Sequence, residues 1–218
     1  MQNMDKQPTL VIATRNPGKT KEIRDLLKGF PITIKNLDDF GPTPEVEEDG
    51  STFDDNAYKK SSFTARILGL PALSDDSGLC VDALDGAPGV YSARYAGDNA
   101  TDEKNCAKVL KELTGQENRK ASFQCVISIA VPTGAALTYE GSCDGVIIES
   151  PRGANGFGYD PVFFFPEFNK TFAQISRKEK SRVSHRGKAL RELRDEFDKV
   201  IQWLRQQMPV EEKFSCKE

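Results

Sequence analysis

Apolar positions follow two spacings along the first third of the chain. Continuous apolar runs predict buried strands over Thr9–Thr14 and Ile32–Leu37. Between these runs, apolar residues recur at helical spacing, so a helix is expected to run to about Lys28. Asn16 followed by Pro17 is typical of a helix start, because asparagine caps the first turn and proline fits the first helical position. This order of strand, helix and strand indicates an α/β fold.

The pattern changes in the middle of the chain, where longer strand-like runs separated by short turns predict an antiparallel meander. Helix starts remain recognisable from capping residues that precede apolar positions at helical spacing. The further expected elements are helices from Thr52 to about Leu68 and from Thr101 to about Gly115, strands Leu79–Leu84, Ala121–Val131, Leu137–Cys143, Val146–Glu149 and Val162–Phe165, a short helix within Thr171–Lys180, and a last helix from Ser184 to about Leu204. The chain therefore begins as α/β and becomes antiparallel.

A short acidic stretch in Ala72–Leu79 stands out from this pattern. Asp75 and Asp76 follow an apolar pair, and Gly78 then allows the chain to turn freely, so a strand that ends in an acidic turn is expected. Adjacent acids are ordinarily part of a solvated loop. Here they lie between two apolar runs, where their repulsion would destabilise the fold unless a cation offset it. Carboxylate oxygens are ligands that Mg²⁺ prefers, so the stretch favours a magnesium site.

Charged residues around the helix from Thr52 add to this acidic stretch. Glu47 and Glu48 come just ahead of the helix and could face a shared cleft, although a solvated loop is the alternative. Lys59 and Lys60 lie on the helix and are expected to be solvated, with Lys59 able to reach a phosphate.

The turn after the first strand is a candidate phosphate site. A strand, a tight polar turn and a helix N-terminus together form an anion site, and Lys19 adds a point charge. The alternative is an ordinary capped helix. Gly18, Lys19 and Thr20 resemble part of a Walker A loop, but that motif requires a glycine where Ala13 stands, so a P-loop is rejected.

Two later segments carry candidate nucleotide-binding residues. The glycine-rich run 151–160 includes Phe157 and Tyr159, whose flat faces could hold a base, although a hairpin packed by aromatics is the alternative. Lys180, His185 and Arg186 gather around the start of the last helix, which again favours an anion. A lone histidine is more often structural than catalytic, so His185 is not assigned as the base.

Composition and charge narrow the class of protein. The 218 residues carry a formal net charge of −3 and suffice for one sizeable domain, expected over residues 9–207 with terminal extensions at 1–8 and 208–218. No apolar run is long enough for a membrane span, and the N-terminus lacks the apolar region of a signal peptide. The mild acidity argues against nucleic acid as a partner. The five widely spaced cysteines favour free thiols in a reducing cytoplasm, and a single histidine argues against a zinc site.

Six motifs in order resemble the family of inosine/xanthosine triphosphate pyrophosphatases of the Ham1 type. They are Thr14–Lys19, Glu47–Phe53, Ser74–Leu79, Gly89–Gly97, Gly156–Pro161 and Lys180–Gly187. The resemblance implies an elongated α/β fold with a long mixed sheet, flanking helices and two lobes around a central nucleotide-binding cleft. It also implies a homodimer and Mg²⁺-dependent hydrolysis of ITP, dITP and XTP to the monophosphate and pyrophosphate. Such an enzyme would cleanse the nucleotide pool, so that these bases are not incorporated into DNA or RNA.

The motifs also give each candidate residue an expected role. Asp76 is the expected catalytic base and a metal ligand, with Asp75 and Glu47 as further ligands and Glu48 as the alternative to Glu47. A cradle of backbone N–H groups, with Lys19 as the counter-charge, is expected to bind the phosphates; its residues are Thr14, Arg15, Asn16, Pro17, Gly18 and Lys19. By resemblance, the residues expected to contact the rest of the nucleotide are Ser77, Phe157, Gly158, Tyr159, Asp160, Lys180, His185 and Arg186.

Selectivity for the base has a physical explanation. Hypoxanthine and xanthine present a carbonyl at C6, where adenine presents an amino group, so a fixed donor would discriminate between them. Either a backbone N–H or Arg186 could supply that donor. Two other classes stay open: a nucleotide-binding regulator without turnover, and a hydrolase for pyrimidine or standard nucleotides. The regulator would have no need for Asp75, Asp76 and Glu47 together, which favours an enzyme.

Overall fold

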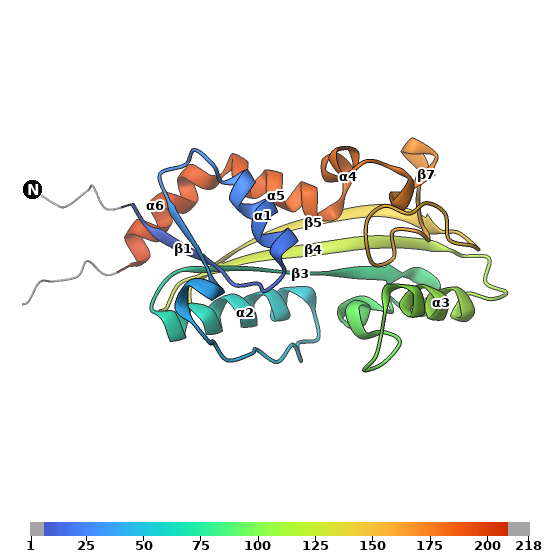
Figure 1. Ribbon diagram of the computed structural model, residues 1–218, viewed down its shortest axis with the longest axis horizontal. Helices are drawn as coiled ribbons and strands as arrows, with labels where there is room; N and C mark the ends of the chain where they lie inside the picture. The colour runs from blue at the N-terminus through green and yellow to red at the C-terminus, as the bar shows by residue number, and fades with distance from the viewer. Residues whose placement is uncertain (1–6, 209–218) are drawn as a thin grey trace, which may run out of the picture.

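The computed structural model describes residues 7–208 and shows an elongated α/β fold built on one seven-stranded mixed sheet, ordered β2-β1-β3-β4-β5-β6-β7 (Figure 1). Helices flank the sheet on both sides. The strands are β1 Thr9–Ile12, β2 Thr33–Asn36, β3 Ala72–Val81, β4 Lys120–Ala130, β5 Ala136–Ile147, β6 Phe163–Phe165 and β7 Lys170–Thr171. The α-helices are α1 Pro17–Leu26, α2 Phe53–Leu68, α3 Asp102–Glu112, α4 Arg177–Val183, α5 His185–Asp195 and α6 Phe197–Gln207. No helix within residues 7–208 is long and apolar enough to cross a membrane.

The central strand β3 runs well past the end of its neighbour β1. The two strands are parallel and pair only at Val11 with Ala72 and at Ile12 with Leu73. On its other side, β3 pairs with antiparallel β4 over its whole length. The part of β3 that follows Leu73 therefore has an open edge next to the turn after β1. In α/β sheets, binding sites commonly form at such ends of strands.

Side chains of β3 alternate between two faces that different helices cover. Leu73 packs with Leu190 and Phe197, which belong to α5 and α6. Ala72, one residue earlier, packs with Ala65 of α2 on the other face. In Figure 1, α2 lies below the strands and α5 and α6 lie above them. Neighbouring residues of β3 thus face different helices.

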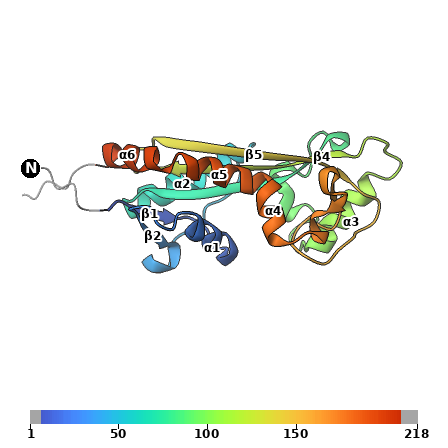
Figure 2. The same cartoon turned by 90° about the horizontal axis from the view of Figure 1, so that it is seen from above.

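The half of the molecule remote from β1 and α6 has its own aromatic core. The rings of Phe123 and Phe163 lie 4.6 Å apart, and those of Phe163 and Phe172 lie 4.9 Å apart. Val109 and Leu113, from α3 and its C-cap, pack in the same cluster. Figure 2 shows α3 and α4 gathered at this end, which confirms two lobes along one sheet.

The backbone of α5 lies directly against β5. A Cβ atom at Gly141 would lie 2.1 Å from the carbonyl oxygen of His185 and 2.8 Å from the nitrogen of Ala189. Only glycine permits this approach, because both of these atoms belong to the helix backbone and cannot move aside. The first turn of α5, which holds His185 and Arg186, is thereby fixed to the sheet.

The predicted acidic turn is wrong. Residues 75–78 lie inside the continuous strand β3, where Asp76 pairs with Val126 and Gly78 with Gln124. Gly78 serves close packing and not a turn, since a Cβ there would lie 2.4 Å from Ser92 Oγ and 2.5 Å from the carbonyl oxygen of Gly89. The predicted strand Leu79–Leu84 accordingly ends at Val81, and residues 82–84 form a 3₁₀ turn.

Two other boundaries also differ from the prediction. Leu137–Cys143 and the first two residues of the predicted strand Val146–Glu149 belong to one strand, β5, which ends at Ile147, because β4 pairs with it without a break from Ala136 to Val146. The predicted last helix is divided at Glu196 into α5 and α6, and Phe197 then packs edge-on against Phe30 at 4.9 Å.

The capping predictions are confirmed. Asn16, Thr52, Thr101 and Ser184 each accept backbone hydrogen bonds at the start of a helix. The described cysteines Cys80, Cys106, Cys125 and Cys143 are free thiols, as expected, whereas Cys216 lies outside the described residues. Most of the two predicted terminal extensions also lies outside them.

Candidate active site

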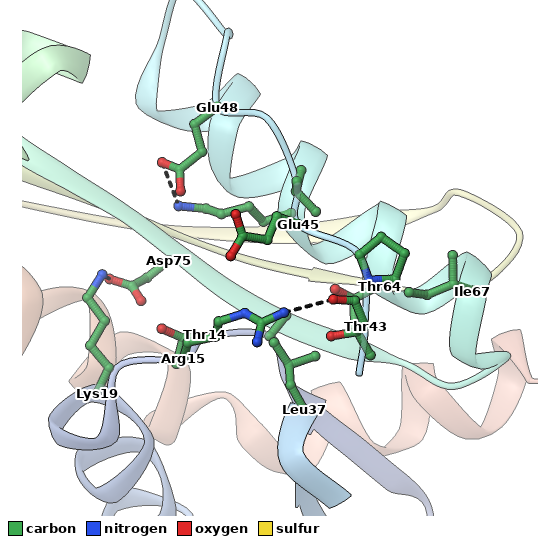
Figure 3. A pocket seen from close by; sticks show the side chains of 14 residues that line it. Thr14, Arg15, Lys19, Leu37, Thr43, Glu45, Glu48, Thr64, Ile67 and Asp75 are labelled. Carbon is green, nitrogen blue, oxygen red and sulfur yellow. Dashed lines mark hydrogen bonds and ion pairs between the residues drawn. The ribbon is translucent and has the colours of Figure 1, made fainter. Parts of the chain in front are cut away.

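A cavity of about 300 Å³ opens where β1 ends beside β3 (Figure 3). Thr14, Arg15 and Lys19 line one side, and Asp75 lies at the same end. The opposite wall consists of residues from segment 43–48 and from α2. Sequence segments that are far apart thus converge on one charged cavity.

Asp75 is buried on the face of β3 that α1 and α5 cover, and two cations surround it. Its Oδ2 lies 2.8 Å from Lys19 Nζ and 3.3 Å from Arg186 Nη1. Glu22 Oε2 also lies 3.1 Å from Arg186 Nε. Burial would raise the pKa of Asp75, but Lys19 and Arg186 outweigh it and hold that pKa below its usual value. Asp75 therefore stays ionised and is a weak proton acceptor.

Asp76 lies on the opposite face, against α2. Its Oδ1 is 3.0 Å from Lys60 Nζ, and its Oδ2 accepts a hydrogen bond from Asn56 Nδ2 at 3.3 Å. Glu48 Oε2 approaches the same Lys60 Nζ at 3.2 Å. Burial raises the pKa of Asp76, and the charge of Glu48 adds to the rise, while Lys60 and Asn56 offset part of it. Asp76 is thus more basic than an ordinary aspartate, which suits a general base.

The expectation that Lys60 is solvated is wrong. Its side chain is only 15% exposed, and the ammonium group lies between Asp76 and Glu48. Burial would lower the pKa of Lys60, but the two carboxylates raise it, so the group is a firmly held cation. Lys59 instead pairs with Asp49 at the surface. The sequence did carry a signal, because Asn56 and Lys60 are four residues apart and therefore share one helix face.

The predicted metal ligands do not gather at one point. Asp75 and Asp76 face opposite sides of β3, and Glu47 is exposed. Within residues 7–208, no group of three His, Cys, Asp or Glu side chains is placed to hold a metal ion. Of the two neighbouring glutamates left open by the sequence, Glu48 faces Asp76. Mg²⁺ commonly takes one or two protein carboxylates and completes its shell with water and phosphate oxygens, so Asp76 and Glu48 fit such an ion.

The turn before α1 differs from the expected cradle of backbone N–H groups. Asn16 Oδ1 accepts hydrogen bonds from the N–H groups of Gly18, at 2.9 Å, and Lys19, at 3.1 Å. Pro17 has no N–H group to offer. Arg15 Nη2 donates to the carbonyl oxygen of Thr43 at 2.8 Å, across the cavity. The positive charge at this end is therefore carried by the side chains of Arg15 and Lys19 and not by free N–H groups.

Replacing Lys19 with alanine should raise KM and lower kcat for the nucleoside triphosphate that the motifs lead us to expect. The lost ammonium group serves both the cavity and the buried carboxylate of Asp75, 2.8 Å away. A charge-assisted contact of this kind is worth about 1.5–3 kcal/mol, so kcat/KM should fall roughly 10- to 100-fold. Steady-state kinetics would measure this fall, with Lys28→Ala as a control, because Lys28 is an exposed lysine in the turn that follows α1. Equal kcat/KM for Lys19→Ala and the wild type would mean that the segment is only a capped helix.

The glycine-rich segment presents one exposed aromatic ring. Phe157 is 70% exposed, and Lys180 Nζ lies 4.5 Å from the centre of its ring. Lys180 also pairs with Asp160, which is buried and accepts a hydrogen bond from the N–H group of Phe157. Tyr159 is buried, and its hydroxyl donates to the carbonyl oxygen of Ser92 at 2.8 Å. Phe157 can therefore meet a base, whereas Tyr159 and Asp160 hold the loop in shape.

The start of α5 carries two polar side chains, His185 and Arg186, with atoms that have no partner in the described part of the chain. The His185 ring stacks on Phe123 at 4.8 Å, and burial lowers the pKa of His185 to about 3, so the imidazole is neutral. Within the described part of the chain, His185 Nδ1 and Arg186 Nη2 are buried without a hydrogen-bond partner. Buried polar atoms are nearly always satisfied, so two that are not indicate a place for a ligand. Ser77 is half-buried on the same face of β3 as Asp75.

The basic residues at this helix start are paired with carboxylates. Lys180 is paired with Asp160, and Arg186 is paired with Asp75 and Glu22. The sequence showed the basic residues together, but their acidic partners come from distant segments.

Comparison with known proteins gives a consistent result. The Ham1 family model matches residues 10–196. The dITP/XTP pyrophosphatase of Desulfotalea psychrophila is 59% identical over 204 residues, which cover 94% of this chain and 92% of that protein. The dITP/XTP pyrophosphatase of Syntrophobacter fumaroxidans is 60% identical over 195 residues, which cover 89% of this chain and 84% of that protein. The solved structure of a HAM1 protein from Coxiella burnetii matches with a TM-score of 0.86 at 43% identity, covering 88% of this chain and 100% of that one. The chain belongs to the Ham1 family.

Proposed function

We propose that this protein hydrolyses the non-standard purine nucleoside triphosphates dITP, XTP and ITP to the monophosphate and pyrophosphate, and so cleanses the nucleotide pool. The observation that carries the proposal is the carboxylate of Asp76, whose pKa is raised by burial. Asp76 and Glu48 both form ion pairs with Lys60, beside a cavity lined by Lys19 and Arg15. The names of the relatives from Desulfotalea psychrophila and Syntrophobacter fumaroxidans support the substrate class.

The chain's own residues can perform the chemistry of this cleavage. A water molecule attacks the α-phosphorus, the bond to the bridging oxygen breaks, and pyrophosphate leaves with that oxygen. Asp76, the more basic of the two aspartates, accepts the proton of the water. Lys19 and Arg15 offset the charge that develops on the departing pyrophosphate. Mg²⁺, held by Asp76 and Glu48, would supply further neutralisation of the phosphate charge.

A screen of pyrophosphate release over about eight nucleotides tests the proposal. Release from dITP, XTP and ITP with Mg²⁺ is expected, and standard purine or pyrimidine triphosphates should give little. Faster pyrophosphate release from a pyrimidine or standard purine triphosphate than from dITP, XTP and ITP would point to a general hydrolase. Nucleotide binding without any turnover would point to a regulator.

Removal of divalent ions should abolish pyrophosphate release. Asp76 and Glu48 are the carboxylates that fit Mg²⁺, and the phosphates need a further positive charge beyond Lys19 and Arg15. The measurement is the rate with dITP in excess EDTA, followed by addition of excess Mg²⁺. Restoration by Mg²⁺ is the control that the protein has not been damaged, and an unchanged rate in EDTA would remove the metal from the mechanism.

The family resemblance further supports a homodimer that works in the cytoplasm, and both remain predictions. The free thiols of the described cysteines are consistent with a reducing compartment. Light scattering of the purified protein would test the dimer, and a mass equal to one chain would contradict it.

A further inference from the structure

The carboxylate of Glu48 is carried by a segment with no helix or strand of its own. Residues 41–50 are irregular, and Thr43, Glu45 and Glu48 from this segment line the cavity. Irregular segments place a side chain accurately only when other residues fix their backbone. The backbone contacts on both sides of the Glu48 side chain therefore decide where its carboxylate lies.

The first of these contacts comes from Arg94, in the motif Gly89–Gly97, to which the proposed mechanism gives no role. Arg94 Nη2 donates to the carbonyl oxygen of Glu48 itself at 2.8 Å. The 3₁₀ helix that carries Arg94, Gly89–Arg94, is anchored on β3 through Ser92. Ser92 Oγ accepts a hydrogen bond from the N–H group of Leu79 at 2.9 Å, three residues after Asp76. Arg94 thus connects Glu48 to the strand that holds Asp76.

The second contact comes from Asn56, which is fully buried in α2. Its Oδ1 accepts a hydrogen bond from the N–H group of Gly50 at 2.8 Å, and its Nδ2 donates to Asp76 Oδ2 at 3.3 Å. One side chain therefore joins the segment just after Glu48 to the Asp76 carboxylate. Gly50 has no space for a side chain, since its Cβ would lie 2.7 Å from Asn56 Oδ1. This close contact leaves the segment little freedom to shift.

Together, the two contacts bring Glu48 to the side of Asp76, where both carboxylates meet the ammonium group of Lys60. We propose that Arg94 and Asn56 are positioning residues that hold Glu48 beside Asp76, and that the affinity of this carboxylate pair for a divalent cation depends on both. The inference deepens the proposed function and rests on it for the role of the pair. Neither residue is assigned a contact with the nucleotide.

The direction in which the metal affinity changes when Arg94 is replaced distinguishes a positioning role from a purely electrostatic one. Arg94 is a cation near a site for a cation, so loss of its charge alone would strengthen metal binding. Loss of its hydrogen bond to Glu48 would instead release the carboxylate and weaken metal binding. Removal of such supporting contacts typically lowers metal affinity by about 10- to 100-fold.

The test is direct binding of Mn²⁺ to the whole protein, measured from the electron paramagnetic resonance signal of the free ion, with and without α,β-methylene-ITP. Arg94→Ala should bind Mn²⁺ about 10-fold more weakly than the wild type. Lys104→Ala is the matched control, because Lys104 is also an exposed cation that donates to a backbone carbonyl, that of Asn99 at 2.8 Å. Asn56→Ala should show the same loss as Arg94→Ala, and if this buried substitution prevents folding, the exposed Arg94 variant still decides.

Equal or tighter Mn²⁺ binding by Arg94→Ala would overturn the inference, as would a wild type that binds no Mn²⁺ in either condition. A lower melting temperature with unchanged Mn²⁺ affinity would also overturn it, since that is the signature of a merely structural role. A separate measurement tests the proposed function, which the absence of pyrophosphate release from dITP would contradict. Weaker Mn²⁺ binding by both variants would support the positioning role even then.

Discussion

Asp76→Asn should lower kcat for dITP by about 1,000-fold and leave the fold intact, because loss of a general base typically costs 10²–10⁴ in rate. The amide has nearly the shape of the carboxylate, so the strand pairing of residue 76 with Val126 should persist. It cannot accept a proton from water at neutral pH and is a weaker ligand for a cation. The raised pKa of Asp76, caused by burial, makes this residue the stronger base of the adjacent pair.

The measurement is single-turnover hydrolysis of dITP, accompanied by circular dichroism and a melting curve. Asp82→Asn is the matched control, since Asp82 is exposed and follows the same strand by one residue. Both variants should have native circular dichroism spectra, and only Asp76→Asn should lose the hydrolysis of dITP. Near-wild-type turnover of dITP by Asp76→Asn in the presence of Mg²⁺ would contradict the assignment of Asp76 as the base.

The second large effect is in the choice of base. We expect kcat/KM for dITP, ITP and XTP to exceed that for ATP by at least about 100-fold, a gap of roughly 2.7 kcal/mol. Among residues 7–208, Arg186 Nη2 is a buried donor without a partner, and the neutral His185 Nδ1 lies unpartnered next to it in sequence. A C6 carbonyl would satisfy Arg186, whereas the amino group of adenine would set a donor against a donor. One such mismatch costs about 1–3 kcal/mol, so a single contact accounts for most of the gap.

Comparison of four nucleotides by steady-state kinetics tests this selectivity. ITP and dITP should differ little, because no feature of the sequence must contact the 2′-position, and this pair serves as the internal control. Chromatography should show the monophosphate and pyrophosphate as first products. Similar kcat/KM for ATP and ITP would contradict a base-selective site, and initial formation of IDP with orthophosphate would contradict cleavage at the α-phosphorus.

Local signals in the sequence predicted the elements that local chemistry controls. Helix starts at Asn16, Thr52, Thr101 and Ser184 were found because a cap involves residues three or fewer positions apart. The residues gathered at the cavity were predicted in part by pattern and in part by family resemblance. Their individual roles with a nucleotide remain predictions that the substitutions above would test.

What the sequence missed depends on contacts between distant segments. The acidic stretch resembled a turn because an Asp-Asp pair before glycine is polar, yet β4 pairs with it and makes it a strand. Lys60 resembled a solvated lysine because its partners, Asp76 and Glu48, come from a strand and a loop elsewhere in the chain. The helical spacing of Asn56 and Lys60 indicated a shared face, but it did not indicate the two partners of Asn56, Gly50 and Asp76, which lie on opposite sides of it in sequence.

The alternation of side chains between the two faces of β3 limits which deletions this strand can accept in evolution. Asp75 and Asp76 have different partners only because a strand turns successive side chains to opposite faces. Deletion of one residue ahead of Asp75 within β3 would present each aspartate to the wrong helix, although every site residue would still be encoded. A three-nucleotide deletion in this strand would therefore be a loss-of-function lesion.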